Sequence, residues 1–261
     1  MPEFTRYAHG TPCWVDVTSP ELDKSVAFYT SLFGWEAERD PRPEAGGYTM
    51  FTLDDKYVAA ASPPQQEGSP SYWTTYLASD DVDDTAAKVR GAGGTVMMDP
   101  FDVFDSGRMT LAQDPTGATF GVWQAKEHIG AQLANEAGTL LWNQCHTPDP
   151  ARATEFYAAV FGYEIDEIDM GGKQPFRVIK VGGRGIGGIR EPVAEEPPHW
   201  SVTFAVDDAD ETAARANELG GTVLMEPFDL PGIGRLAVLH DPADAVFQIM
   251  KSAGPPPDPP V

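Results

Sequence analysis

Apolar and polar residues alternate along residues 11–18, which predicts a β-strand because successive side chains of a strand point to opposite faces. One face carries Cys13, Val15 and Val17, and the other carries Trp14, Asp16 and Thr18. The spacing then becomes helical, with apolar residues at Leu22, Val26, Tyr29 and Phe33. We expect Ser19 or Asp23 to cap this helix and Gly34 to end it.

Short strands are expected next, at residues 48–53 and 57–61. The order then begins again with a strand at residues 72–78, an Asp-rich cap at residues 80–81 and a helix at residues 82–91. Further strands are predicted near residues 95–98, 108–113 and 119–123. Each unit is therefore a strand, a helix and about three strands, or a βαβββ module.

The whole pattern occurs a second time. Residues 14–36, WVDVTSPELDKSVAFYTSLFGWE, match residues 142–164, WNQCHTPDPARATEFYAAVFGYE, and later Asp114-Pro115 matches Asp241-Pro242. A period this long indicates two whole domains rather than a solenoid of short repeats. We place the first domain at residues 10–125, a connector of helical composition at 126–137, the second domain at 138–250 and a proline-rich tail at 251–261.

Acidic residues far outnumber basic ones, with 40 Asp and Glu against 18 Lys and Arg and a formal net charge of −22. Such a charge repels phosphate backbones and anionic membrane surfaces, so we expect no nucleic-acid or membrane partner. The N-terminus lacks the features of a signal peptide, which favours a cytoplasmic protein, although leaderless export would leave no mark. Cys13 and Cys145 have no metal-binding spacing and are expected to be buried free thiols. A monomer or a homodimer is expected.

The doubled module, with its SPELDKSVAFY helix start and its DPTGATFGVW ending, resembles the vicinal oxygen chelate superfamily. That superfamily includes glyoxalase I, bleomycin-resistance proteins and extradiol dioxygenases. The blocks GTPCW, FYTSLFGWE and GGTVMMDPFDVFDSGRM are similar to two-domain actinobacterial glyoxalase-like proteins, often labelled hydroxylases or antigens. The resemblance implies an α+β fold with a tandem duplicated domain. Each domain would consist of two βαβββ modules whose mixed sheet forms a cup, with helices outside.

The resemblance also implies where a divalent ion would be held. The corresponding positions lie on the first strand, on the strand before the second helix and on the last strand of each domain. In this chain they carry Pro12, Thr74 and Gly121, and then Leu140, Ser201 and Gln248. Pro, Leu and Gly have no donor side chain, and one Gln does not hold an ion alone. We therefore expect no metal at these positions and assign no cofactor.

The alternation along each strand also predicts which side chains face the two cups. The first cup should be lined by Trp14, Asp16, Tyr72, Thr74, Tyr76 and Trp123. The second should be lined by Trp142, Gln144, His146, His199, Ser201, Thr203 and Gln248. Aromatic rings with a few polar groups suit a small, flat organic ligand. An equally good alternative is that Trp14 and Trp142 plug filled barrels.

Asp16, His146 and His199 are the candidate catalytic residues. A carboxyl beside Trp14 could have a raised pKa and act as an acid or base, whereas a salt bridge from Asp16 to Arg108 or to a Lys at the rim of the cup is the alternative. His146 and His199 could converge as a general base and its partner, or as ligands of an unusual metal site. Ordinary hydrogen bonds are the alternative for this pair, because no carboxylate is expected nearby.

The favoured interpretation is a metal-independent member of this superfamily that binds or transforms a small, flat organic molecule. Its reaction would be lyase- or isomerase-like, or hydroxylase- or dioxygenase-like. Two alternatives stay open: a divalent-metal enzyme with a non-standard site at His146 and His199, and a sequestering, resistance-type protein without turnover. We expect binding to favour the first cup, and any catalysis the second, because an unperturbed imidazole titrates near neutral pH.

Overall fold

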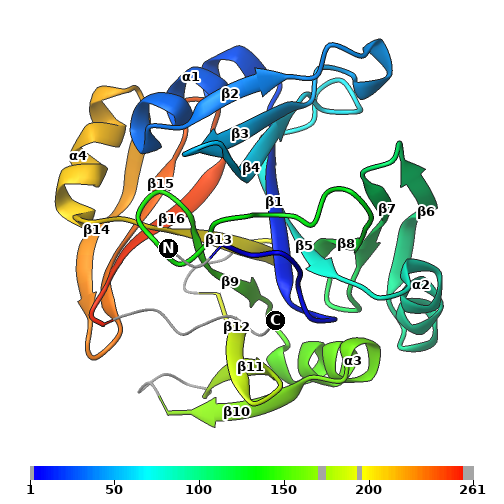
Figure 1. Cartoon of the computed structure of the whole chain (residues 1–261). Coiled ribbons are helices and arrows are strands. Elements are labelled where there is room, and N and C mark those ends of the chain that lie inside the picture. The colour runs from blue at the N-terminus through cyan, green and yellow to red at the C-terminus, as the bar shows by residue number, and fades with distance from the viewer. Residues whose placement is uncertain (1–2, 170–174, 193–195, 255–261) are drawn as a thin grey trace.

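The computed structural model describes residues 3–169, 175–192 and 196–254, and within them the chain forms two eight-stranded mixed sheets (Figure 1). Part of the predicted proline-rich tail, residues 255–261, lies outside the described residues. The first sheet contains β1 (Pro12–Thr18), β2 (Glu36–Arg39), β3 (Thr49–Leu53), β4 (Lys56–Ser62), β5 (Tyr72–Ala78), β6 (Thr95–Val103), β7 (Gly107–Gln113) and β8 (Thr119–Ala125). The second contains β9 (Leu140–His146), β10 (Glu164–Ile168), β11 (Phe176–Val181), β12 (Arg184–Arg190), β13 (His199–Ala205), β14 (Thr222–Leu230), β15 (Gly234–His240) and β16 (Val246–Ser252).

The two sheets have the same topology, which confirms the predicted duplication and the α+β class. The strand order is β2-β3-β4-β1-β5-β8-β7-β6 in the first and β10-β11-β12-β9-β13-β16-β15-β14 in the second. In each, the two central strands are antiparallel to each other and parallel to their outer neighbours. The helices are α1 (Leu22–Phe33), α2 (Val82–Gly91), α3 (Pro150–Phe161) and α4 (Ala209–Glu218), with a short 3-10 helix η1 (Pro43–Ala45).

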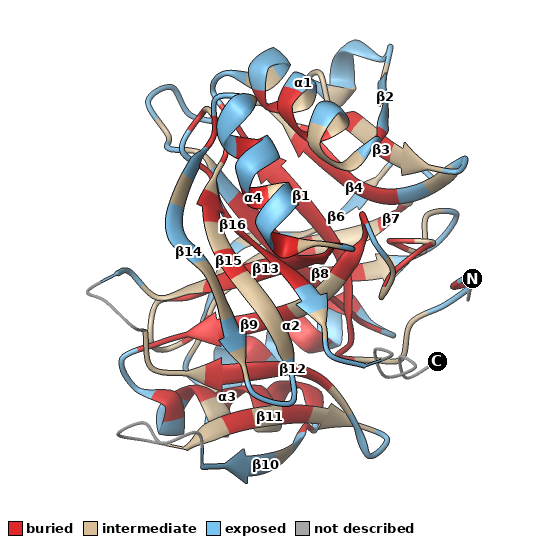
Figure 2. Cartoon of the chain, turned by 90° about the vertical axis from the view of Figure 1, so that its left-hand side faces the viewer, coloured by how far each residue is buried: buried red, intermediate tan, exposed pale blue. Residues whose placement is uncertain are grey.

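Each helix packs on strands of its own sheet and also against one helix of the other sheet. Helix α1 contacts α4, and α2 contacts α3, as Figure 1 also shows. Two core clusters result. One lies between the βαβββ modules that contain α1 and α4, and the other between those that contain α2 and α3. Equivalent hydrogen bonds stabilise both: Trp73 Nε1 donates to Tyr29 Oη at 2.9 Å, and Trp200 Nε1 donates to Tyr157 Oη at 2.7 Å. The buried strands between the helices are visible in Figure 2.

Carboxylates at the turns before β8 and β16 also join the two halves. Tyr157 Oη of α3 donates to Asp114 Oδ2 at 3.0 Å, and Ser25 Oγ of α1 donates to Asp241 Oδ2 at 2.9 Å. Both carboxylates also accept backbone N–H groups of their own turns. The Asp-Pro motifs therefore tie each sheet to a helix of the other half. No helix among the described residues is long and apolar enough to cross a membrane.

Three helix starts follow the expected capping chemistry and one does not. Asp81, Asp149 and Asp208 accept backbone N–H groups at the starts of α2, α3 and α4. The expectation that Ser19 or Asp23 caps α1 is wrong, because Glu21 is the N-cap and makes no side-chain cap hydrogen bond. Ser19 Oγ accepts the N–H of Glu21 at 3.2 Å, which orders the chain just before the helix.

The expected helix of the connector is absent from residues 126–138, all of which the structure describes. This segment runs extended against the first sheet, where Ala131 N donates to Cys13 O at 2.8 Å. Gly130 has a φ of +107°, and a Cβ there would lie 2.2 Å from Cys13 O. A helix would break this close backbone contact, so tertiary packing overrides the helical composition.

Candidate functional site

The strand register places the residues expected in each cup on one face of its sheet. In the first sheet Trp14 lies opposite Tyr76, and Asp16 lies opposite Thr74. Their sequence neighbours on the same strands, among them Val15, Val17 and Trp73, lie in the core beneath the helices. Trp14, Asp16, Thr74, Tyr76 and Trp123 are all buried in the first cup, and the Trp14, Tyr76 and Trp123 rings belong to one core cluster. Tyr72, at the end of β5, is 45% exposed and lies at the rim.

Asp16 is the centre of a hydrogen-bond network in the first cup. Tyr76 Oη donates to Asp16 Oδ2 at 2.9 Å, and Tyr48 Oη donates to the same oxygen at 3.2 Å. Trp14 Nε1 in turn donates to Tyr48 Oη at 3.0 Å. Burial raises the pKa of Asp16 to about 6, although the hydrogen bonds from Tyr76, Tyr48 and Thr74 oppose this rise.

The alternative salt bridge from Asp16 to Arg108 is wrong. Arg108 pairs instead with Asp83 at 2.9 Å and with Asp102 at 3.6 Å. Both partners lie on the outside of the sheet, whereas Asp16 is only 4% exposed. The unexpected partner is Tyr48, which the sequence reading did not assign to the cup.

The connector closes the first cup. The ring of His128 meets Trp14 edge-on with centroids 4.6 Å apart, and Trp123 Nε1 donates to His128 O at 2.8 Å. Ala131 is fully buried in the same cluster. The extended connector places the His128 ring against this aromatic wall. Burial accordingly lowers the pKa of His128 to about 4.

The second cup has the same register with different side chains. Trp142 lies opposite Thr203, Gln144 opposite Ser201, and His146 opposite His199. Thr203 also lies beside Gln248 of β16, whose Oε1 accepts the Thr203 hydroxyl at 3.0 Å. These seven residues therefore lie on one face of the second sheet. Gln144, His146, Ser201, Thr203 and Gln248 are each at most 9% exposed.

His146 connects these polar groups. Its Nε2 lies 2.9 Å from the Gln144 amide nitrogen and 3.2 Å from Ser201 Oγ. With these two groups as donors, Nε2 is the acceptor and Nδ1 carries the hydrogen. Burial lowers the pKa of His146, and the contact with Glu196 opposes that effect. His146 is therefore held as a neutral imidazole at neutral pH, with one nitrogen on the polar wall of the cup.

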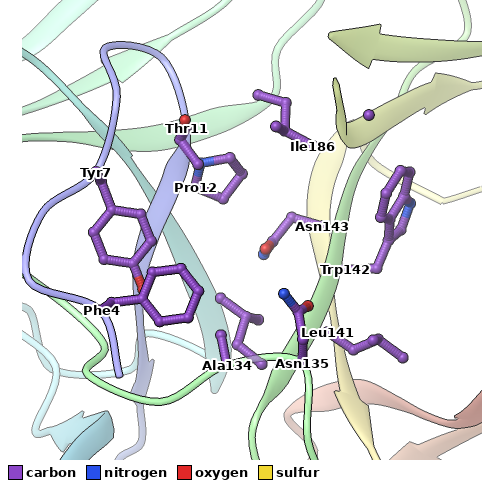
Figure 3. Close-up of a pocket in the computed structure, with 12 residues that line it drawn as sticks. Phe4, Tyr7, Thr11, Pro12, Ala134, Asn135, Leu141, Trp142, Asn143 and Ile186 are labelled. Atoms are coloured by element: carbon purple, nitrogen blue, oxygen red, sulfur yellow. The ribbon is translucent and has the colours of Figure 1, made fainter. Parts of the chain in front are cut away.

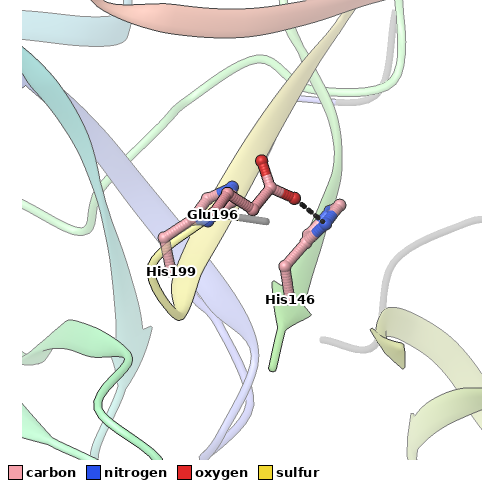
Figure 4. A group of neighbouring side chains, drawn as sticks. All are labelled: His146, Glu196 and His199. Carbon is pink, nitrogen blue, oxygen red and sulfur yellow. Dashed lines mark ion pairs between the residues drawn. The ribbon is translucent and has the colours of Figure 1, made fainter. Parts of the chain in front are cut away.

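Glu196 is the residue that the sequence reading missed. Its Oε1 lies 3.3 Å from His146 Nδ1, as the dashed line in Figure 4 marks. His199 stacks on His146 with ring centroids 4.8 Å apart and an interplanar angle of 17°. Glu196 lies three residues before His199, in the Glu-Pro-Pro-His segment that leads into β13. The expected absence of a carboxylate near the histidines is thus wrong.

The residues at the family's metal positions do not fit a metal ion. In the first cup a Cβ at Gly121 would lie 2.1 Å from the Tyr76 ring, so this ring fills the space of a ligand side chain. Pro12 and Leu140 have no side-chain donor. In the second cup Gln248 Oε1 accepts the Thr203 hydroxyl, and Ser201 Oγ contacts His146. The hydrogen-bonded Gln and the hydroxyl are poor ligands for a divalent ion.

A small pocket lies between the N-terminal arm and strands β9 and β12. Figure 3 shows Phe4 and Tyr7 of the N-terminal arm on one side and Trp142 and Asn143 on the other. Its volume is about 50 Å³, well below the roughly 300–1,000 Å³ of ligand pockets. This pocket is therefore too small to hold an organic substrate.

Comparison with known proteins gives a consistent result. Residues 12–122 match the family model described as Glyoxalase/Bleomycin resistance protein/Dioxygenase superfamily, and residues 143–250 match that of a Glyoxalase-like domain. The chain is 48% identical over 258 residues to "Putative glyoxylase CFP32" of Mycobacterium tuberculosis, covering 97% of this chain and 99% of that protein. It is 40% identical over 264 residues to the anthracycline biosynthesis protein DnrV of Streptomyces peucetius, covering 95% of each.

A solved structure supports the fold. The Mn(II)-bound glyoxalase from Novosphingobium aromaticivorans superposes with a TM-score of 0.67 at 18% identity, covering 93% of this chain and 82% of that one. At this identity the likeness shows the shared fold alone.

Proposed function

The chain belongs to the glyoxalase/bleomycin resistance protein/dioxygenase superfamily, and we propose that it binds a small, flat organic molecule in its second cup and exchanges a proton with it through His146. The observation that carries this proposal is the polar wall of that cup. Gln144 and Ser201 converge on His146 Nε2, at 2.9 and 3.2 Å, on a buried face of the sheet. Buried polar groups of this kind orient a ligand, and the accepting nitrogen of a neutral imidazole is able to take up a proton as a base.

The proposal places binding in the second cup, not in the first as the sequence alone favoured. In the first cup Tyr48 and Tyr76 donate hydrogen bonds to Asp16, and Trp14 donates one to Tyr48. The connector covers these side chains. A ligand would have to displace these side chains and break their hydrogen bonds. In this proposal Asp16 therefore stabilises the first cup and does not act on a ligand.

The shape of the ligand follows from the aromatic side chains of the second cup. The Phe176 ring lies over Gly188, where a Cβ would be only 2.3 Å from the ring. Trp142 lies on the same face of the sheet as Gln144 and His146, by the alternation along β9. Rings next to amide and hydroxyl groups suit a flat molecule with polar substituents. The relative named for anthracycline biosynthesis supports this class, since anthracyclines are flat aromatic compounds.

The test is a panel of flat aromatic compounds, screened by quenching of tryptophan fluorescence and then by calorimetry. For a compound that binds, Ser201→Ala should weaken binding by about tenfold, because one hydrogen bond contributes roughly 0.5–1.5 kcal/mol. The matched variant Thr74→Ala, at the equivalent position of the first cup, should leave the affinity unchanged. The reverse result would assign the ligand to the first cup.

Turnover is tested separately with His146→Gln, which keeps a hydrogen-bonding side chain but removes the titrating group. Product formation should fall by roughly 100–10,000-fold, as for the loss of a general acid or base, with little change in affinity. Tight binding with no product in the unaltered protein would favour the sequestering, resistance-type function instead.

A further inference from the structure

We propose that His146, Glu196 and His199 together bind one divalent transition-metal ion at the edge of the second cup, outside the family's metal positions. One ligand atom from each of the three residues lies within 4.8 Å of the others. Among the described residues they form the only such group of three or more His, Cys, Asp and Glu side chains. This inference goes beyond the proposed function, because the ion needs no organic ligand in order to bind.

The two histidines are brought together by the sheet itself. His146 ends β9, His199 begins β13, and the two are direct partners in the antiparallel register. Directly opposite residues have Cβ atoms about 4.5–5.5 Å apart, close enough for two imidazoles to share one ion. The centroids of the two stacked rings are 4.8 Å apart, and Figure 4 shows Glu196 next to them.

His199 already has the hydrogen bonding of a metal ligand. Its Nδ1 lies 2.9 Å from Pro197 O, to which it donates, so Nε2 carries the free lone pair. Metal-binding histidines usually donate their second N–H to a carbonyl or carboxylate in this way, which fixes the tautomer and the ring orientation.

His146 supplies an independent observation. It is 6% exposed, and its Nδ1 is a buried nitrogen without a hydrogen-bond partner among the described residues. Glu196 Oε1 lies 3.3 Å from this nitrogen, but the contact does not have hydrogen-bond geometry. A cation between Nδ1 and the carboxylate would satisfy both groups. On the other side of the ring, Ser201 and Gln144 hold Nε2 as outer-shell partners.

The donor set indicates the kind of ion. Two imidazoles and one carboxylate suit Zn²⁺, Co²⁺, Ni²⁺ or Fe²⁺ better than Ca²⁺ or Mg²⁺. Zn–N bonds of about 2.0–2.1 Å require donors roughly 3.4 Å apart in a tetrahedron, so the side chains must draw together from their present separation. Glu196 is able to move, since its side chain is 37% exposed. Arg190, opposite His146 on β12, opposes the ion by its charge, and its Nε donates to Glu191 O.

An ion on Nδ1 would change what His146 presents to the cup. Nε2 would then carry the hydrogen and donate to Ser201 Oγ, whereas without the ion Nε2 accepts. The Gln144 amide would turn its oxygen toward the ring. The ion therefore sets whether His146 offers the ligand a donor or an acceptor.

The test is a titration of the metal-stripped full chain with Zn²⁺ by calorimetry and with Co²⁺ by visible absorption. We expect one ion per chain and the d–d bands of a low-coordinate Co²⁺ site. His146→Ala and His199→Ala should each weaken binding by more than the roughly 10–100-fold typical of outer-shell changes, and Glu196→Gln by at least about tenfold. The matched control is His240→Ala, because His240 also has a carboxylate nearby, Asp244 at 3.6 Å, but no second histidine.

Two results would overturn the proposal: the absence of one-site binding in the unaltered protein, and an affinity that survives both histidine variants. Should His146→Ala fail to fold, Glu196→Gln alone decides, since an exposed side chain is replaced by one of the same shape. ¹⁵N spectra of labelled histidine provide a second readout, in which Zn²⁺ should move the hydrogen of His146 from Nδ1 to Nε2. Failure of the proposed ligand binding is distinguishable, because Trp142→Ala should weaken the organic ligand and leave Zn²⁺ binding unchanged.

Discussion

The two cups have the same strand register but different side chains in their interiors. Asp16 in the first corresponds to Gln144 in the second, Tyr48 to Phe176, Tyr76 to Thr203 and Gly121 to Gln248. The first cup places three aromatic side chains around one buried carboxyl, which they satisfy. The second replaces both tyrosines and has two amides, two hydroxyls and two histidines on its wall.

These differences are coupled rather than independent. The Tyr76 ring requires Gly121, and the hydroxyls of Tyr48 and Tyr76 have Asp16 as their acceptor. In the second cup Thr203 is small, which leaves room for Gln248, and Phe176 has no hydroxyl to satisfy. A duplicated fold can thus give one copy a packed interior whose polar groups hydrogen-bond to one another. The other copy keeps polar groups that a ligand or an ion can use.

The largest expected effect is on stability, from placing the second cup's side chain in the first. Gly121→Gln introduces a Cβ 2.1 Å from the Tyr76 ring and should destabilise the fold by about 3 kcal/mol, since overpacking typically costs 1–3 kcal/mol and sometimes more. Adding Tyr76→Thr, the second cup's partner, should recover part of the loss. Urea denaturation of both single variants and the double variant measures the coupling. Additive effects would show that the two positions are independent.

Much of this comparison was predictable from sequence, because strand alternation is a local property. The faces of Trp14, Asp16, Gln144 and His146 follow from period-two patterns that the register confirms. Glu196 was not predictable in this way, since it lies in a loop where no periodicity indicates a direction. Its one signal was the three-residue spacing to His199. The helix expected in the connector was wrong because composition does not reveal the close approach of Gly130 to the Cys13 carbonyl. A Cβ at Gly130 would lie only 2.2 Å from Cys13 O.

The next effect concerns pH and distinguishes the two cups by charge. The folded pKa of Asp16 is about 6 against 3.8 for the free group, because burial penalises the carboxylate. Below pH 3.8 the group is protonated in both states and contributes nothing. As pH rises to about 6, the unfolded chain loses its proton first, so folding loses stability up to about 3 kcal/mol, at 1.36 kcal/mol per pKa unit.

The variant Asp16→Asn should lack this loss. The unfolding free energy of Asp16→Asn minus that of the unaltered protein should therefore increase progressively between pH 4 and pH 7. This holds whatever the difference is at low pH. Guanidinium denaturation at several pH values gives the difference curve. The reciprocal variant Gln144→Glu should introduce a similar dependence into the second cup. A flat difference curve for Asp16→Asn would mean that the carboxyl is not held in a raised-pKa state.

The smallest expected effect tests the single hydroxyl that separates Tyr48 from Phe176. Tyr48→Phe removes a donor to Asp16 and the acceptor of Trp14 Nε1, so it should cost about 1–2 kcal/mol, in the range of one hydrogen bond with a buried partner left unsatisfied. It should also raise the pKa of Asp16 further, because that hydrogen bond lowers it. The loss of stability caused by Asp16 should then extend to higher pH. Phe176→Tyr, which adds a hydroxyl where Gln144 replaces the carboxyl, should gain no comparable stability, and an equal gain would show that the networks are interchangeable.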